Sequence, residues 1–321
     1  MKENITEIDY ILSRIMPIED LFLIMRAVKN WHDLLLFRFG LKKNITITLK
    51  SGKKCKIRNS KDYFVFLHRT KDWALELARQ MKPSIMIDKK IIKVRAFNRN
   101  VLLYFDSPTA LGSSVALAIE QFIDEEYSWL DVKGKDVVDI GATVGDTAIY
   151  FTIRGAKHVY AIEPFLNSYN IAKRNIRLNK LTKKITLLNK ALSKKKGFVY
   201  TKIGDEIRTG ISLNEGISPH GKKIEVLTLE DVVNKYKIKD GALKLDCEGC
   251  EYESILNTST AILRHFDQIA IEYHYGYINL KKKLEEAGFE VNHTIPKYSG
   301  YDNVFDPIMY VGLIFAKKKT V

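Results

Sequence analysis

The segment "LKLDCEGCEYE", residues 243–253, combines side chains that enzymes use for acid–base, redox and metal chemistry. Asp246 and Glu248 are carboxylates, which can orient a hydroxyl group and accept its proton. Cys247 and Cys250 have the Cys-x-x-Cys spacing that is found in many metal and redox sites. The chemistry of this segment therefore depends either on the acids or on the sulfur atoms.

The two cysteines are poor candidates for a metal or redox site. A structural zinc ion needs four ligands, and the chain offers only one more cysteine, the distant Cys55. A thioredoxin-like pair would lie at a strand-to-helix junction, as this one does, but the neighbouring acids would raise the thiol pKa values. We therefore expect Cys247 and Cys250 to be small filling side chains that alanine could replace.

The acids lie where two predicted strands end. The run "LKLD" places Asp246 at the carboxyl end of a strand, where open α/β sheets bind ligands. The next strand ends in "IEYHY", so Glu272 and His274 lie at the corresponding edge, two residues apart and on one face. Together with Glu248 they could bind a hydroxyl group, activate a base or hold a divalent metal. His274 could equally be an ordinary polar residue at a strand end.

A glycine-containing loop predicts a ligand-binding site. In "VVDIGATVGDTAIYF" an apolar strand precedes Gly141 and Gly145, and a helix follows. Glycines at such a turn allow a ligand to approach the backbone beside the helix N-terminus. The spacing Gly-x-x-x-Gly is not the Gly-x-Gly-x-x-Gly of dinucleotide sites, which argues against NAD. The next strand ends in Glu163, near the distance at which an acid accepts hydrogen bonds from a ribose diol.

Seven strand-like runs alternate with helical segments from about residue 130 onward, which is typical of parallel βαβ units. They predict an α/β fold with an open, Rossmann-like sheet that is covered by helices on both faces. The longer passage 197–224 predicts a hairpin or a mobile loop that borders the site. The predicted strands are Asp136–Ile140, His158–Glu163, Ile185–Asn189, Ala242–Asp246, Gln268–Tyr273, Glu290–Ile295 and Met309–Ala316.

The first part of the chain has a different pattern, which predicts a small α+β domain. A helical pattern runs from Asn4 to Phe39, the alternating stretch 44–59 predicts a β-hairpin, and a helix over 63–81 precedes three short strands. We therefore divide the chain into an accessory, substrate-selecting domain over residues 1–127 and a second domain over residues 128–321. One face of the hairpin either faces water or meets phosphates, and it carries Lys50, Lys54, Lys56 and Arg58.

Composition limits the class of protein. The chain has 321 residues, 46% of them hydrophobic, and a formal net charge of +14. A basic surface favours nucleic-acid, headgroup or acidic-substrate partners, or serves only for solubility. Glu3, Glu7 and Asp9 occupy the region where a secretory signal would be apolar, so we expect a cytoplasmic protein. The early apolar stretches are too short to span a membrane, although one of these helices could lie against one.

The stretches quoted above resemble the S-adenosylmethionine-dependent methyltransferases of the FkbM family over residues 135–316. The resemblance implies a seven-stranded methyltransferase sheet with S-adenosylmethionine as the cofactor. One departure is Thr143, where relatives usually have asparagine in "GANVGD". The stretches that carry the resemblance are "VVDIGATVGDTAIYF", "VYAIEPFLNSYNIAKRNIRLN", "LNKALS", "LKLDCEGCEYESIL" and "IEYH".

The resemblance also implies roles for individual residues. Asp139 and the loop Gly141–Gly145 would hold the methionine part of the cofactor, Glu163 its ribose hydroxyls, and Asn189–Leu192 its adenine. The implied cofactor-binding residues are Asp139, Gly141, Ala142, Thr143, Gly145, Asp146, Glu163, Pro164, Asn189, Ala191, Leu192 and Asp246.

The family pattern "D-x-E-G-x-E" matches Asp246, Glu248, Gly249 and Glu251. We expect the first two acids to face the reaction centre, whereas Glu251 could simply begin a helix, where acids are favoured. The expected catalytic residues are Asp246, Glu248, Glu272 and His274, and no residue is assigned to a metal.

The activity that the resemblance implies is O-methylation of a hydroxyl group on a sugar, a glycolipid or a secondary metabolite. Two alternatives remain open. The net charge of +14 and the basic hairpin face would suit an RNA acceptor. The chain could also be a non-catalytic binding module on a methyltransferase scaffold, because a fold does not guarantee a chemistry. The partner is expected to be a small-molecule, glycan or lipid acceptor, with RNA as the alternative.

Overall fold

The computed structural model describes residues 4–12, 18–59, 62–63, 66, 70–107, 110–201, 222–298 and 310–319. The chain forms two compact units. The sheet unit consists of Met1–Arg14, Glu126–Ser299 and Ile308–Val321, and the small unit of Ile15–Glu125 and Gly300–Pro307. Residues 4–12 therefore belong with the sheet, although they lie at the start of the chain.

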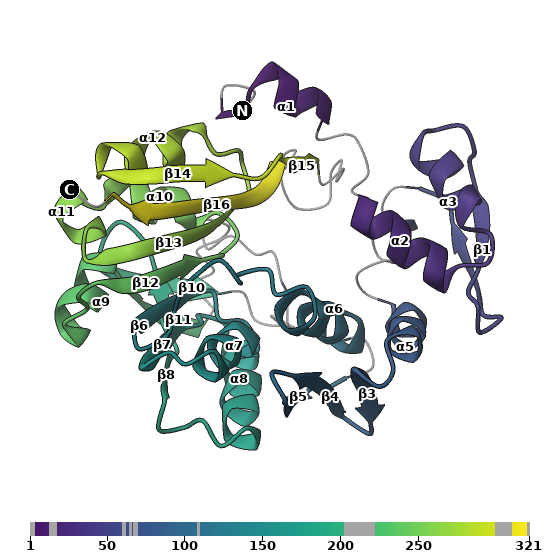
Figure 1. Cartoon of the computed structure of the whole chain (residues 1–321), viewed down its shortest axis with the longest axis horizontal. Coiled ribbons are helices and arrows are strands. Elements are labelled where there is room, and N and C mark those ends of the chain that lie inside the picture. The colour runs from purple at the N-terminus through teal and green to yellow at the C-terminus, as the bar shows by residue number, and fades with distance from the viewer. Residues whose placement is uncertain are drawn as a thin grey trace. The chain divides into compact units, whose positions relative to one another are not determined.

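Seven strands of the sheet unit lie side by side in the order β14-β16-β13-β12-β6-β7-β8 (Figure 1). Neighbouring strands are parallel, except that β16 runs antiparallel between β13 and β14. All seven predicted strands are present close to their predicted bounds, so the prediction of an α/β fold with a Rossmann-like sheet is confirmed. The strands are β6 (Asp136–Ile140), β7 (His158–Ile162), β8 (Ile185–Leu188), β12 (Gly241–Leu245), β13 (Phe266–Tyr273), β14 (Phe289–His293) and β16 (Tyr310–Lys318).

The central strands are buried on both faces, as parallel strands between two helical layers must be. Every residue of β12 is buried, and Leu243 and Leu245 join Phe266 and Phe289 in one hydrophobic cluster. The helices of this unit lie between the strands in the chain and cover the sheet (Figure 1). They are α7 (Asp146–Ile153), α8 (Leu166–Leu178), α9 (Leu229–Tyr236), α10 (Cys250–Asn257), α11 (Thr260–Leu263) and α12 (Ile278–Glu286).

The strand order reverses between β6 and β12. From β6 the chain proceeds to β7 and β8 on one side, whereas β12 and β13 lie on the other. Open α/β sheets bind ligands in the crevice that such a reversal leaves at the carboxyl ends of the strands. This edge carries the predicted site residues.

A smaller sheet lies in the passage between β8 and β12. It consists of β9 (Ala191–Leu192), β10 (Gly197–Thr201) and β11 (Lys222–Leu227). Strands β10 and β11 pair antiparallel, as the predicted hairpin requires. The remainder of that prediction, residues 202–221, lies outside the described residues.

The small unit contains two antiparallel sheets and several helices. Strands β1 (Ile45–Thr48) and β2 (Lys54–Ile57) form the predicted hairpin, with Lys54 and Lys56 exposed on it. No described helix of the chain is long and apolar enough to cross a bilayer. The other elements are α2 (Ile18–Ala27), α3 (Trp31–Arg38), α5 (Lys71–Gln80), β3 (Ile85–Asp88), β4 (Ile91–Ala96), β5 (Arg99–Tyr104) and α6 (Ala110–Phe122).

Asn4 attaches the start of the chain to the sheet unit, just before helix α1 (Glu7–Leu12). Its side-chain amide donates to the carbonyl oxygens of Tyr275 at 2.8 Å and Gly276 at 3.0 Å. Its side-chain oxygen accepts from the backbone N–H of Asn279 at 2.9 Å. One side chain thereby satisfies three backbone groups in the turn between β13 and α12.

We predict that Asn4→Ala destabilises the sheet unit by about 2 kcal/mol, because three hydrogen bonds are lost at roughly 0.5–1.5 kcal/mol each. The free energy of unfolding in urea, followed by circular dichroism, measures this effect. Glu7→Ala is the control because the Glu7 side chain is exposed in α1. Equal stability of Asn4→Ala and wild type would show that the attachment contributes nothing.

Candidate active site

Lys244 lies at the centre of the site and is 1% exposed. Across the β6–β12 pairing it lies opposite Asp139, and its Nζ is 3.5 Å from carboxylate oxygens of both Asp139 and Asp246. It also donates to the carbonyl oxygens of Ile140 at 3.3 Å and Gly141 at 3.0 Å. Burial alone would lower the pKa of Lys244, but Asp246 and Asp139 outweigh it and raise the pKa. Lys244 is therefore a buried ammonium ion.

Two acids in this region are buried near the start of α7. Asp139 is fully buried, its Oδ2 accepts from the Thr147 hydroxyl at 2.7 Å, and its Oδ1 accepts no hydrogen bond from the described residues. Burial raises the pKa of Asp139, while Lys244 opposes this rise. Burial also raises the pKa of Asp146, the first residue of α7, to about 7. Oδ1 of Asp139 instead faces Nζ of Lys244 at 3.5 Å, which partly compensates its charge.

The glycine loop takes a backbone path that side chains disfavour. Gly141 has φ +76° and Gly145 has φ +81°. A Cβ atom on Gly141 would lie 1.7 Å from the carbonyl oxygen of Asp246, so the loops after β6 and β12 are in direct contact. Thr143 also has a positive φ, +44°, which is unfavourable for a β-branched residue and better tolerated by asparagine.

Glu163 directly follows β7 and connects the end of this strand to the glycine loop. Its Oε2 accepts from the backbone N–H of Thr143 at 2.9 Å, and its Oε1 from that of Phe165 at 2.8 Å. Burial raises the pKa of Glu163 to about 8, against the effect of these two N–H groups. The Asn189 side chain donates to the carbonyl oxygens of Glu163 at 3.0 Å and Pro164 at 2.8 Å. The ends of β6, β7 and β8 are thereby joined.

Residues 246–251, which follow β12 and include the start of α10, form a left-handed turn around Glu251. We call this segment the acid loop. Glu248 has φ +58° and Gly249 has φ +111°. The carboxylate of Glu251 is fully buried, and it accepts from the backbone N–H groups of Cys247 and Gly249, both at 2.7 Å. Glu251 does lie in the first turn of α10, as the sequence suggested. It also determines the shape of the loop, which the sequence did not reveal.

His274 lies between two carboxylates of this loop. Its Nε2 is 3.1 Å from Oε2 of Glu248, and its Nδ1 is 3.3 Å from Oε1 of Glu251. Burial alone would lower the pKa of His274, but Glu248 and Glu251 together raise it well above its usual value. The imidazole is therefore protonated at neutral pH, and it holds Glu248 in place.

Asp246 and Glu272 influence each other, and their pKa values shift in opposite directions. Burial and the neighbouring Asp246 raise the pKa of Glu272 well above its usual value. Burial would also raise the pKa of Asp246, but Lys244, His274 and a hydrogen bond from Glu272 lower it. A proton shared by this pair is therefore favoured on Glu272 rather than on Asp246.

Three of the predicted residues have the geometry of a cation site. Donor atoms of Asp246, Glu248 and His274 lie within 4.8 Å of one another. Carboxylate oxygens and an imidazole nitrogen suit several divalent metals. However, Nε2 of His274 is already paired with Glu248, so a metal ion would have to displace the imidazole proton.

The prediction for the two cysteines is wrong. Cys247 and Cys250 are not separate filling side chains but are joined by a disulfide bond. The left-handed turn at Glu248 and Gly249 brings their Cα atoms to 5.4 Å, within the range that a disulfide spans. The bond closes the same loop that carries the acids.

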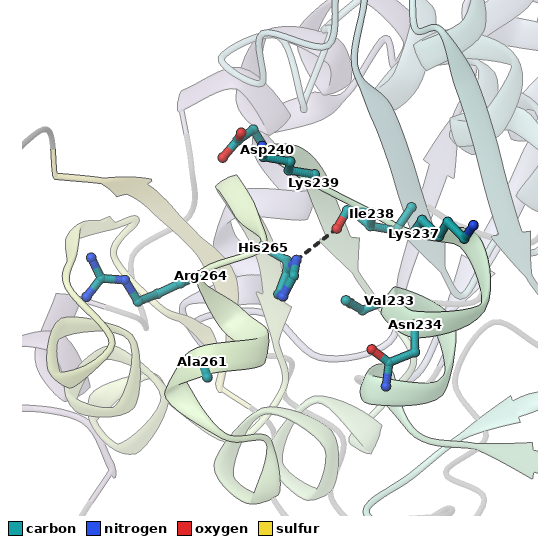
Figure 2. Close-up of a pocket in the computed structure, with 9 residues that line it drawn as sticks. All are labelled: Val233, Asn234, Lys237, Ile238, Lys239, Asp240, Ala261, Arg264 and His265. Carbon is teal, nitrogen blue, oxygen red and sulfur yellow. Dashed lines mark hydrogen bonds between the residues drawn. The ribbon is translucent and has the colours of Figure 1, made fainter.

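A separate pocket of about 520 Å³ lies at the opposite edge of the sheet (Figure 2). It is lined by residues that precede β12 and β13, such as Ile238 and His265, whose Nδ1 is 2.9 Å from the carbonyl oxygen of Ile238. Figure 2 shows the Arg264 and Lys237 side chains pointing to opposite sides of this pocket. Its position at the amino ends of the strands separates it from the acids.

The predicted site residues divide into two groups. The acids, His274, the glycine loop, Pro164 and Asn189 are connected by the contacts described above. Ala191 and Leu192 are instead buried in β9 and pack into hydrophobic clusters, so their part in binding a ligand stays a prediction. Lys244 was missed, and its only signal is a single lysine inside the apolar run "ALKL".

Comparison with known proteins agrees with this site. The model of the methyltransferase FkbM domain matches residues 139–291, which begin at Asp139 and include the acid loop and His274. Over residues 139–291 the chain is therefore similar to a methyltransferase FkbM domain. The family resemblance inferred from the sequence is therefore confirmed. No curated protein matches the chain.

Solved structures of methyltransferases also resemble the chain, at low identity. The FkbM methyltransferase from Methylobacillus flagellatus is 14% identical over 67% of this chain and 56% of its own, with a TM-score of 0.39. TrmK from M. capricolum, solved with S-adenosylhomocysteine, is 18% identical over 60% of this chain and 66% of its own, with a TM-score of 0.37. The METTL16 methyltransferase domain is 13% identical over 85% of this chain and 86% of its own, with a TM-score of 0.42. The chain thus spans less than two thirds of the M. flagellatus protein.

We predict that Gly141→Ala disrupts the FkbM domain, because the new Cβ would collide with the backbone of Asp246. Gly134→Ala is the matched control: Gly134 has φ +73°, and nothing lies within 4 Å of the added Cβ. Thermal unfolding should show a loss for Gly141→Ala that exceeds the loss for Gly134→Ala by several degrees. Similar losses would mean that only backbone strain matters at Gly141.

Proposed function

We propose that the protein is an S-adenosylmethionine-dependent O-methyltransferase that acts on a hydroxyl group of a sugar, a glycolipid or a secondary metabolite. One observation carries the proposal. Within the FkbM domain, the glycine loop, Glu163 and the ionised Asp246 lie together at the carboxyl ends of adjacent strands. This is the edge at which α/β sheets bind their ligands.

The residues at this edge fit the cofactor. In this proposal the backbone of Gly141–Gly145 and the Asp139 carboxylate, whose Oδ1 is also 3.5 Å from Nζ of Lys244, hold the methionine part of the cofactor. Glu163 uses one lone pair of each oxygen for a backbone N–H, which leaves lone pairs for two ribose hydroxyls. Pro164, Asn189, Ala191 and Leu192 would lie around the adenine, with Ala142, Thr143 and Asp146 completing the loop.

The acids of the loop fit methyl transfer to an oxygen. When bound, S-adenosylmethionine supplies a methyl group on a positively charged sulfur. The hydroxyl proton of an acceptor would become strongly acidic as its oxygen forms a third bond, to the methyl carbon, and the methyl–sulfur bond breaks, so a weak base is sufficient to take the proton. Asp246 and Glu248 are the carboxylates for this step. His274, already protonated, would position Glu248 rather than act as the base, and Glu272 would orient Asp246.

We predict that cofactor affinity rises with pH through the pKa of Glu163. The free protein keeps this carboxyl protonated below about pH 8, whereas hydrogen bonds from ribose hydroxyls favour its ionised form. The apparent affinity of a ligand that selects the ionised form is its intrinsic affinity multiplied by the ionised fraction. Calorimetry with S-adenosylhomocysteine should therefore show a dissociation constant about tenfold lower at pH 8 than at pH 6.5.

Glu163→Gln should bind more weakly and lose this pH dependence, because glutamine does not titrate. Glu290→Gln, which changes an exposed residue of β14, should behave as wild type does. A pH dependence that persists in Glu163→Gln would assign the titration to another group and contradict the proposed ribose contact.

The acceptor and the role of Glu248 are tested together. Transfer from a radiolabelled methyl donor should be screened against lipid, glycan and RNA fractions. We predict label in a hydroxyl-bearing lipid or glycan, and a kcat at least tenfold lower for Glu248→Gln with cofactor affinity within about twofold of wild type. Glu253→Gln, in helix α10, which follows the loop of Glu248, is the control.

Three outcomes would count against this proposal. Label in RNA, with RNA binding that weakens steeply with salt, would favour the RNA acceptor. A protein that binds no S-adenosylhomocysteine would be a non-catalytic module on this scaffold. An unchanged kcat in Glu248→Gln would remove Glu248 from the reaction.

A further inference from the structure

We infer that the Cys247–Cys250 disulfide is a redox-active site, which exchanges with a dithiol reductant and thereby controls the position of Glu248. The inference rests on the proposed function for its effect on turnover, but not for the exchange itself. The disulfide encloses Glu248 and Gly249, and Oε2 of Glu248 is 3.1 Å from Nε2 of His274. Glu248 and Gly249 are the two residues between the bonded cysteines, so breaking the disulfide acts first on the acid loop.

Two interactions hold this turn in its left-handed conformation. The first is the Glu251 carboxylate, which accepts from the N–H groups of Cys247 and Gly249. The second is the disulfide. A non-glycine residue in the left-handed region costs roughly 1–2 kcal/mol, and Glu248, with φ +58°, bears this cost. Reduction removes one of the two interactions that oppose it.

Reduction also requires the loop to widen. Bonded sulfur atoms are about 2.0 Å apart, whereas non-bonded heavy atoms need roughly 3.5–4 Å. Cys250 is 7% exposed and belongs to the hydrophobic cluster of the sheet unit, whereas Cys247 is only half-buried. Cys247 is therefore the residue that can shift, and it lies between Asp246 and Glu248. Displacing a catalytic group by about 1 Å can slow a reaction up to 100-fold.

The positions of the two sulfur atoms define the course of the exchange. A thiolate of the reductant attacks the more exposed Cys247, and the sulfur–sulfur bond breaks to release Cys250 as a thiolate. Cys250 is the first residue of the eight-residue helix α10, where the helix dipole favours a negative charge. The second thiol of the reductant then displaces Cys247 from the mixed disulfide. The reductant becomes a disulfide, and the protein gains two electrons and two protons as two thiols.

The exchange is tested with dithiothreitol on the full chain. Thiol titration of the denatured protein should detect Cys55 alone before reduction and all three cysteines after it. Hydrogen exchange of the Cys247 and Gly249 amides should become at least tenfold faster on reduction, while the amide of Leu243 in β12 stays protected. These two measurements need no acceptor, so they stand even if the proposed function fails.

The effect on turnover is measured with the acceptor fraction that accepts label. Reduction should lower kcat at least fivefold and leave the dissociation constant of S-adenosylhomocysteine within about twofold. The Cys247→Ser/Cys250→Ser variant should have the lower rate with or without dithiothreitol. Cys55→Ser, in β2 of the small unit, should keep the full response. Amide exchange and kcat that do not change on reduction would overturn the inference, as would three titratable thiols in the untreated protein.

Discussion

The candidate site depends on one buried ammonium ion. Nζ of Lys244 lies 3.5 Å from both Asp139 in β6 and Asp246, which follows β12, on the two sides of the strand reversal. Without this cation, the buried carboxylate of Asp139 would face that of Asp246 with no cation within ion-pair distance of it among the described residues, which proteins avoid at a cost of several kcal/mol. Because Lys244 also binds the carbonyl oxygens of Ile140 and Gly141, it stabilises the close approach of the two loops that only a glycine at 141 permits. The charge of the Lys244 side chain thus stabilises the contact between the glycine loop and the acid loop.

Lys244 and His274 act unequally on the acids around them, so the pKa values of these acids shift in different directions. Against the effect of burial, Lys244 and His274 lower the pKa of Asp246, whereas burial and Asp246 raise that of Glu272. Glu163, which has only backbone N–H partners, keeps a pKa of about 8. In the proposed reaction the carboxylates at this edge would attract the positively charged sulfonium group of the cofactor.

The sequence predicted the strands of the sheet and the acids well, because buried parallel strands are recognisable as apolar runs and their ends are easily located. It did not predict Lys244, since a single lysine in an apolar run does not reveal which carboxylates lie on the neighbouring strands. It also failed for Cys247 and Cys250. Their spacing permits a disulfide, but their approach depends on a left-handed turn that the buried Glu251 holds. Both failures concern contacts that depend on the tertiary structure, and a local sequence pattern does not predict such contacts.

The distribution of charge bears on the acceptor. The acids gather at the carboxyl ends of β6 and β12, whereas Lys237, Lys239 and Arg264 line the pocket at the opposite edge. The net charge of +14 therefore does not describe the reaction centre. A phosphate-rich acceptor would be repelled by the same carboxylates that favour a sulfonium ion, unless basic surfaces elsewhere bound its backbone. In the proposed reaction a neutral hydroxyl-bearing acceptor would meet no such repulsion, because its hydroxyl would donate to Asp246 or Glu248. This distribution of charge supports the proposed sugar or lipid acceptor over RNA.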